Sequence, residues 1–380
     1  MYKYFGFLIL LSIVSIFNTI AQTKIDAELR PRFEFRNGYK KMPDSTTSPN
    51  YVVTQRSRIN FLYKKDRLTA KIAIQDARTW GEEPLKTDVP NLGVFEAWGE
   101  ILLIDSLSLK AGRQELFYDN ERLLSRNNWS VKGVTHDAAV LKYKKGSLSA
   151  EFGNAFNQPN ETSNFGTNYI IDGNYKSLNY LWATKVVDSL TFSVIGIADG
   201  YQRRGTKNTL YVRGTSGGSI AYKNNALKAV ARGYYQFGRD TIGKSIQSYY
   251  ASTDITYKLG KANLLLGAEY FSGNNGKDTL NKKMNAFSYL YGSGHGFNGQ
   301  MDYFTDIPKH TKKAGLIDLY VGCTYKFTDK LSLKADVHYF QFQNNLLRNK
   351  AAMTVYDPYL ASEIDLLCKY DYSKEISVST

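Results

Sequence analysis

The 380-residue sequence is poor in proline, histidine and cysteine, with eight, four and two residues respectively. After its first 21 residues it also lacks any apolar run near the roughly 20 residues that a membrane-spanning helix needs, which excludes a helical membrane protein. Both cysteines, Cys323 and Cys368, fall on the apolar side of alternating segments, with another such segment between them. We therefore interpret them as apolar face residues and not as a disulfide, although two cysteines in an exported chain could form one.

The scarcity of histidine restricts catalysis, because only His136, His295, His310 and His338 are present. No GxSxG motif occurs, and the stretch 292–295 (GSGH) lacks the strand–turn–helix context that a nucleophilic serine needs. Asp336 and His338 share one face of a segment, but neighbours on a strand seldom adopt the geometry of a catalytic triad. No His/Cys/carboxylate spacing suggests a metal site. We predict no enzyme, no metal and no cofactor.

The N-terminus predicts export. Lys3 gives a short basic region, Phe5 to Phe17 an apolar core, and Thr19 to Ala21 a small-residue cleavage site before Gln22. The apolar core is shorter than the roughly 20 residues of a membrane anchor, which is the alternative interpretation. The expected division is therefore a signal peptide at 1–21 and a mature domain at 22–380.

The mature chain opens with a strict alternation of apolar and charged residues, which is typical of a β-strand. Its apolar face holds Ile25, Ala27, Leu29, Pro31, Phe33 and Phe35, and its charged face holds Asp26, Glu28, Arg30, Arg32, Glu34 and Arg36. So many charges on one face favour a transmembrane β-barrel, which is apolar outside and polar inside. An arginine facing lipid at the bilayer midplane costs roughly 2–4 kcal/mol, so the charged face must be the lumen.

The alternation persists through most later segments, although residues 170–222 alternate less clearly. It predicts that Arg56, Arg58, Trp98 and Lys110 face the lumen. It also predicts that Phe95, Ala97, Ile101 and Leu103 face the membrane.

The connections alternate between short and long, as in bacterial outer-membrane barrels with short periplasmic turns and long external loops. Short turns are predicted near Lys65, Asp105, Lys145, Asp188, Asn224, Gly260, Asp329 and Ser373. Long polar loops are predicted at 37–50, 81–92, 115–133, 156–174, 199–207, 238–244, 273–313 and 343–360. Gly112 to Asp137 interrupts the alternation most clearly, and its middle is expected to form a charged loop at the external mouth.

This pattern gives about sixteen complete strands and, at Glu375 to Thr380, the start of a seventeenth. A closed antiparallel barrel needs an even number of strands, and eighteen is the nearest closure. We therefore predict an all-β, transmembrane antiparallel β-barrel with eighteen strands in the full-length protein and a truncated C-terminus here. The alternative is a complete sixteen-stranded barrel with a short tail.

The formal net charge of +14 is spread along alternating faces and is not clustered into one basic patch, so we predict no nucleic-acid partner. Arginine binds carboxylates in a planar two-point geometry and can attract anions into a channel. The alternative is that these residues only pair with acidic residues such as Glu28, Glu34, Glu96 and Glu100. The predicted pore-lining and substrate-binding residues are Arg30, Arg32, Arg56, Arg58, Arg78, Lys110, Arg113, Arg122, Arg126, Trp98 and Trp129.

The segment 273–313 is too long for a simple connector, and loops of that length are often functional. Its glycines and aromatic residues suggest that it folds over or into the lumen as a gate. The aromatic side chains could stack on sugar rings, although interfacial aromatic girdles are the simpler explanation for isolated cases. The predicted gating residues are Tyr289, Tyr291, His295, Phe297, Tyr303 and Phe304.

Four stretches resemble the alginate-export family of outer-membrane barrels: AELRPRFEFR at 27–36, GRQELFYDNERLL at 112–124, HDAAVLKY at 136–143 and GHGFNGQMDYF at 294–304. The resemblance implies an eighteen-stranded barrel with an electropositive pore for an anionic uronate polymer. We thus expect a Gram-negative outer-membrane channel that passively conducts an alginate-like saccharide. Its expected partners are membrane lipid, the anionic saccharide and periplasmic proteins for export or uptake. The alternatives are a general or anion-preferring porin for small solutes and a closed structural or adhesive barrel.

Overall fold

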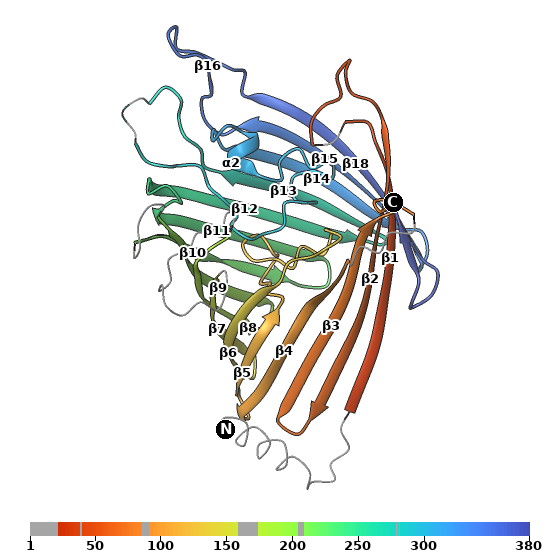
Figure 1. Ribbon diagram of the computed structural model, residues 1–380. Coiled ribbons are helices and arrows are strands. Elements are labelled where there is room, and N and C mark those ends of the chain that lie inside the picture. The colour runs from red at the N-terminus through yellow and green to blue at the C-terminus, as the bar shows by residue number, and fades with distance from the viewer. Residues whose placement is uncertain are drawn as a thin grey trace.

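The computed structural model describes residues 22–38, 40–85, 91–158, 174–203, 209–278, 280 and 282–380. These residues form a 17-stranded antiparallel sheet in which each strand pairs with the next along the chain. A separate two-stranded hairpin, β16–β17, lies in a connection outside this sheet. Figure 1 shows that the strands curve around a common interior. The predicted signal peptide at 1–21 lies outside the described residues.

The strands of the first half are β1 (Gln22–Arg36), β2 (Asn50–Lys65), β3 (Leu68–Thr79), β4 (Leu92–Ile104), β5 (Leu107–Gln114), β6 (His136–Lys145), β7 (Leu148–Phe156), β8 (Ser177–Val187) and β9 (Leu190–Gln202). Those of the second half are β10 (Leu210–Lys223), β11 (Leu227–Arg239), β12 (Ser245–Leu259), β13 (Ala262–Phe271), β14 (Leu316–Lys326), β15 (Leu331–Phe342), β16 (Leu347–Asn349), β17 (Thr354–Val355), β18 (Tyr359–Asp371) and β19 (Ser377–Ser379). A short helix, α2 (Ile307–His310), precedes β14.

The connections confirm the predicted alternation, since all eight predicted short turns separate consecutive paired strands. The predicted seventeenth strand is β19, which pairs with β18. Parts of the predicted loops at 37–50, 81–92, 156–174, 199–207 and 273–313 lie outside the described residues. Among the residues that are described, no helix is long and apolar enough to cross a bilayer.

The two faces of the sheet differ as predicted. On β1, Ile25, Leu29 and Phe33 point outward and are 64%, 69% and 65% exposed, as membrane-facing side chains are in the absence of lipid. The neighbouring strand β2 buries Arg56 and Arg58 on the opposite face. Both cysteines are free, and β15 lies between the strands that carry them.

One predicted facing is wrong, because β4 contains a β-bulge. Its register against β3 shifts so that Glu96 lies opposite Ala73 and Val94 opposite Ile74, which leaves Phe95 without a partner. A bulge re-aims a side chain, and Phe95 accordingly turns inward and is 6% exposed while Val94 faces outward. The guanidinium carbon of Arg58 lies 3.6 Å from the centre of the Phe95 ring.

The buried core lies inside the curve of the sheet and is completed by two long connections. Leu116, Leu123 and Leu124 after β5, and Phe287, Phe304 and Ile307 after β13, pack with inward side chains such as Tyr180, Tyr250 and Phe271. Figure 1 shows both connections within the curve of the strands, the first in yellow to orange and the second in blue around α2. The fold is therefore a barrel-type sheet with two of its own connections packed against its inner face.

Gly112 on β5 generates a stability prediction. Its φ of +125° is a conformation that residues with a side chain rarely adopt, and an added Cβ would lie 2.2 Å from the carbonyl oxygen of Ala97. We expect Gly112→Ala to lower the free energy of unfolding by about 1–3 kcal/mol. Gly99→Ala is the matched control, because a Cβ there meets nothing within 4 Å. Denaturant midpoints in detergent micelles measure both variants, and equal midpoints would contradict the prediction.

Candidate solute pathway

The connection after β5 crosses the interior and touches several parts of the wall. The Tyr118 hydroxyl donates to Glu151 on β7 at 2.7 Å. Asp119 accepts from the Ser193 hydroxyl on β9 at 2.6 Å and from the Trp182 indole on β8 at 3.1 Å. Further along, the segment reaches the arginines of β1 and β2. The loop thus spans the lumen and is not confined to the external mouth.

Arg122 holds this loop against the far wall. Its side chain is 1% exposed and forms an ion pair with Glu269 on β13. The same guanidinium donates to Asn298 Oδ1 at 3.2 Å and lies 4.0 Å from the centre of the Phe297 ring. Arg122 was predicted to line the pore, but in this arrangement it is buried and cannot contact a solute. It joins two loops and the wall.

The connection after β13 is clamped by inward carboxylates of the wall. The Asn298 amide donates to Glu269 at 2.7 Å and to Asp318 on β14 at 3.0 Å. The backbone N–H of Met301 donates to Glu363 on β18 at 2.8 Å. A Cβ on Gly299 would lie 2.4 Å from the Glu363 carboxylate, and the φ of +79° at this position is a conformation that favours glycine.

The two connections also bind each other. Leu124 and Tyr291 form an isolated parallel bridge. The Tyr291 N–H donates to Leu123 O at 3.0 Å, and its hydroxyl donates to Asp199 on β9 at 2.8 Å. We name residues 115–135 and 282–315 together the plug. As predicted for the second connection, the chain folds into the lumen, but the gating function itself stays a prediction.

The remaining predicted gating residues are packed to different degrees. Tyr289 and Phe297 surround the Arg122 guanidinium. Phe304 is buried against Phe340 of β15, with ring centres 4.7 Å apart. The Tyr303 hydroxyl contacts the Met42 sulfur at 3.3 Å, near the external end.

Burial controls the protonation of several plug residues. It raises the pKa of the Glu115 carboxyl, and the negative charge of Glu96 adds to this effect. Burial also raises the pKa of the Tyr118, Tyr289 and Tyr291 phenols. The protonated hydroxyls of Tyr118 and Tyr291 donate to Glu151 and Asp199.

The predicted arginines of β1 and β2 do come together on the inner wall. Arg30 donates to the carbonyl of Asn128 at 2.6 Å and of Ser130 at 3.0 Å, and Arg32 donates to the carbonyl of Trp129 at 2.8 Å. Arg56 binds Asn128 Oδ1 at 2.8 Å and pairs with Glu28 at 2.5 Å.

Arg58 belongs to this group through an indirect contact with the same loop, made by Gln75. It donates to Gln75 Oε1 at 2.6 Å, and the amide of Gln75 in turn donates to Lys132 O at 2.9 Å. We name Arg30, Arg32, Arg56 and Arg58 the arginine wall.

Trp129 lies at the centre of a stack. The His295 ring is parallel to its indole within 7° at a centre-to-centre distance of 3.8 Å. The guanidinium carbon of Arg32 lies 4.3 Å from the indole centre, and since one face is filled by His295 it lies over the other. His295 is itself oriented by Asp302, 2.7 Å from its Nδ1. Both faces of the Trp129 indole thus have a neighbour, while the residue keeps 42% of its surface exposed.

Two other predicted cations, Lys110 and Arg126, contact neighbouring side chains. Lys110 faces inward with its Nζ 4.0 Å from the centre of the Trp98 ring, and Trp98 donates to Glu96 at 3.0 Å. Arg126 pairs with Glu121 of the same connection at 2.9 Å.

Arg78 and Arg113 are not on the inner face, which corrects their assignment as pore-lining residues. Strand alternation places Arg78 on the same face as Ile72, and Arg113 on the same face as Leu109. Ile72 and Leu109 are apolar and exposed on the outer face. Each arginine is paired on that outer face, Arg78 with Asp76 at 2.7 Å and Arg113 with Asp137 at 3.8 Å. The two arginines were assigned to the pore because they lie near loops in the sequence, and strand alternation was not applied to them.

Some residues of the site were not predicted. Asn128, Asn298 and Glu269 gave no signal, because their partners are distant in sequence; 147 residues separate Arg122 from Glu269. Within the described part of the chain, no group of three or more His, Cys, Asp or Glu side chains is arranged to hold a metal ion.

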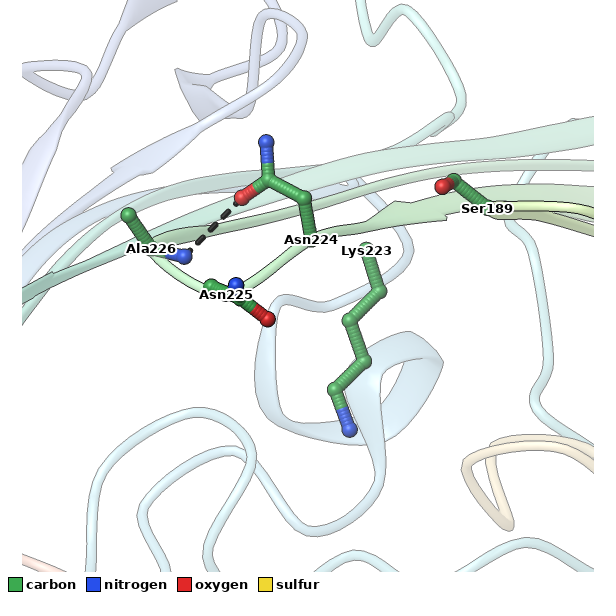
Figure 2. Close-up of a pocket in the computed structure, with 5 residues that line it drawn as sticks. All are labelled: Ser189, Lys223, Asn224, Asn225 and Ala226. Carbon is green, nitrogen blue, oxygen red and sulfur yellow. Dashed lines mark hydrogen bonds between the residues drawn. The ribbon is translucent and has the colours of Figure 1, made fainter.

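A surface cavity lies away from the plug, at the short turn between β10 and β11 (Figure 2). It is lined by Ser189, Lys223, Asn224, Asn225 and Ala226. Asn224 Oδ1 accepts from the Ala226 N–H at 2.9 Å, as Figure 2 shows, which is the usual way an asparagine stabilises a turn. We assign this cavity to turn structure.

An antiparallel sheet with an apolar outer face, a charged interior and loops folded into it defines an outer-membrane barrel of the porin type. Solved structures agree. The outer-membrane protein OpdK from Pseudomonas aeruginosa matches with a TM-score of 0.60 at 12% identity, covering 94% of this chain and 92% of that one. OpdQ from the same species matches with a TM-score of 0.56 at 14% identity, covering 94% and 91%. An anion-selective porin from Comamonas acidovorans matches with a TM-score of 0.53 at 9% identity, covering 91% and 98%.

The family model for alginate export matches residues 21–373. The chain therefore belongs to the alginate export family, which confirms the resemblance found in its sequence. No curated protein matches it in a sequence comparison. Membership and fold together make it an outer-membrane channel protein of a Gram-negative cell.

The Arg122–Glu269 pair provides a test of the plug. Removing one partner of a buried pair leaves an uncompensated charge and costs roughly 3–5 kcal/mol. Glu269→Gln removes the charge and keeps one acceptor oxygen where Glu269 has two, which accept from Tyr250 and Asn298. Arg122→Met removes the other charge. We expect the double variant to unfold at a higher denaturant concentration than Glu269→Gln alone. Losses that simply add in the double variant would show that the pair is not coupled.

Proposed function

We propose that this channel passively conducts an anionic polysaccharide or oligosaccharide of the alginate-like uronate class along the arginine wall. The protein acts in transport and not in catalysis. Direction would come from a solute gradient or from a periplasmic partner, since the chain shows no nucleotide-binding motif.

The observation that carries the proposal is the chemistry of the acceptors that face these arginines. Arg30 and Arg32 donate to backbone carbonyls and Arg58 to a glutamine amide, and these acceptors carry no charge. Glu28 and Glu34 are the acidic residues on the same strands that lie within ion-pair distance of the wall. Arginine stays ionised at any physiological pH, so the wall keeps an excess of positive charge that attracts carboxylates.

The wall also remains accessible. The Arg30 and Arg32 side chains keep 31% and 20% of their surface exposed, whereas Arg56 on the neighbouring strand is 1% exposed. A carboxylate entering the lumen could therefore reach the first two. Successive carboxylates of a uronate chain could then be passed between guanidinium groups, each of which binds a planar anion at two points.

A second candidate function is that of an anion-preferring porin for small solutes. The plug favours it, because both long connections cross the interior and are fixed to the wall by buried contacts. A narrowed lumen would admit a short anionic solute more readily than a polymer. Block of the current by uronate oligomers of increasing length distinguishes the two: affinity rising with length supports a polysaccharide path, and no dependence beyond one sugar supports the porin.

Replacement of Arg30 and Arg32 by Gln in planar-bilayer recording tests the wall. A unit charge at about 4 Å in water is worth about 1 kcal/mol, so we expect the anion-to-cation permeability ratio to fall by roughly fivefold. High salt should reduce the difference by screening. Arg67→Gln is the matched control, because Arg67 is 58% exposed at a short turn and pairs with Asp105. An unchanged ratio in the double variant would show that the wall is structural, and absence of any current would favour a closed structural barrel.

A further inference from the structure

The part of the plug that touches the arginine wall is built differently from the rest. Residues 127–132 are named here the tip. The hydrogen bond from Val134 N to Arg126 O, at 2.9 Å, closes the base of this segment. One further backbone bond, from Ser130 N to Asn127 O at 3.1 Å, lies within the tip. Asn128 and Trp129 are exposed, whereas Leu123, Leu124 and Ser125 in the root are buried. Root and tip therefore differ in how firmly they are held.

The tip presents oxygens to the wall in the way an anionic ligand would. The carbonyls of Asn128, Trp129 and Ser130 and the side-chain Oδ1 of Asn128 accept from Arg30, Arg32 and Arg56. All of these acceptors are neutral. Hydrogen bonds from arginine to a carboxylate are stronger than those to a neutral oxygen and are often bidentate. A carboxylate of suitable shape would thus compete with the tip for the same guanidinium groups.

Resting on the function proposed above, we propose that the tip is an internal, displaceable ligand that occupies the uronate-binding site of the arginine wall until an anionic saccharide replaces it. Displacement removes Arg32 from one face of Trp129 and draws the indole away from His295. The freed indole then offers a flat apolar face to the sugar ring whose carboxylate the arginines hold. The buried root keeps its place, so the change is confined to the tip between Arg126 and Val134.

The stacking of Trp129 makes the change visible. The chain has four tryptophans, Trp80, Trp98, Trp129 and Trp182. Incorporation of 5-fluorotryptophan gives four fluorine resonances, and Trp129→Phe assigns the one of interest. Titration of the full chain in micelles with trigalacturonate should move the Trp129 resonance and leave that of Trp80, on the outer face, in place. Neutral maltotriose should move neither.

Two variants test the competition from opposite sides. Asn128→Asp places an ionised oxygen where Asn128 already contacts Arg56, so we expect half-displacement to require roughly tenfold more trigalacturonate, the change expected when a neutral acceptor becomes charged. Arg30→Gln with Arg32→Gln should shift the Trp129 resonance without ligand. Asn225→Asp, at the exposed turn of Figure 2, adds the same charge far from the wall and should titrate like the parent protein.

The outcomes separate this proposal from the function on which it rests. If trigalacturonate blocks the ion current but leaves the Trp129 resonance unmoved, the tip is fixed and the proposal is overturned while the proposed function stands. If trigalacturonate affects neither current nor resonance, both fall. If Asn128→Asp leaves the trigalacturonate concentration at half-displacement unchanged, competition for the arginines is also overturned.

Discussion

The arrangement of the interior depends on how the inward-facing arginines are satisfied. A guanidinium cannot lose its charge to escape burial, so each one needs acceptors. Here the backbone carbonyls of a loop supply them for Arg30 and Arg32, an amide supplies them for Arg58, and a carboxylate supplies them for Arg122. The neutral acceptors leave the positive charge in place, and Glu28 and Glu34 offset only part of it, whereas Glu269 cancels the charge of Arg122. Arginine thus has a structural role at Arg122 and, in the proposed function, attracts anions at Arg30 and Arg32.

These two uses divide the interior. The wall of β1 and β2 is basic, and the inward faces of β13, β14 and β18 carry Glu269, Asp318 and Glu363. The plug is fixed on the acidic side by Arg122, Asn298 and backbone N–H groups, and it meets the basic side with carbonyl oxygens. Its orientation across the lumen follows from this complementarity. In the proposed displacement, the exposed tip leaves the basic side while the buried root stays anchored on the acidic side.

Much of the fold could be predicted from the sequence because strand parity is a local property. The inward facing of Arg56 and the outward facing of Ile25 follow from the period of two once the membrane is invoked. Phe95 was predicted wrongly since a bulge changes parity without altering the residue pattern. Arg78 and Arg113 were assigned from their nearness to loops, where parity should have decided.

The site itself was less predictable. The length of the second loop predicted that it would enter the lumen. The partners of Arg122 and Trp129 are Glu269 and His295, which lie 147 and 166 residues away, and no local pattern indicates them. The arginine wall was predicted as a group because its four members occupy neighbouring strands, and Asn128, its main contact, was not.

The reversal potential of the unmodified channel across a tenfold gradient of KCl shows whether anions or cations pass more readily. An excess of uncompensated arginine charge predicts a potential of the sign produced by chloride, moving toward zero as the salt concentration rises. A potential of the opposite sign, produced by potassium, would contradict the account, because the acidic residues of β13 to β18 and not the arginine wall would then control the path.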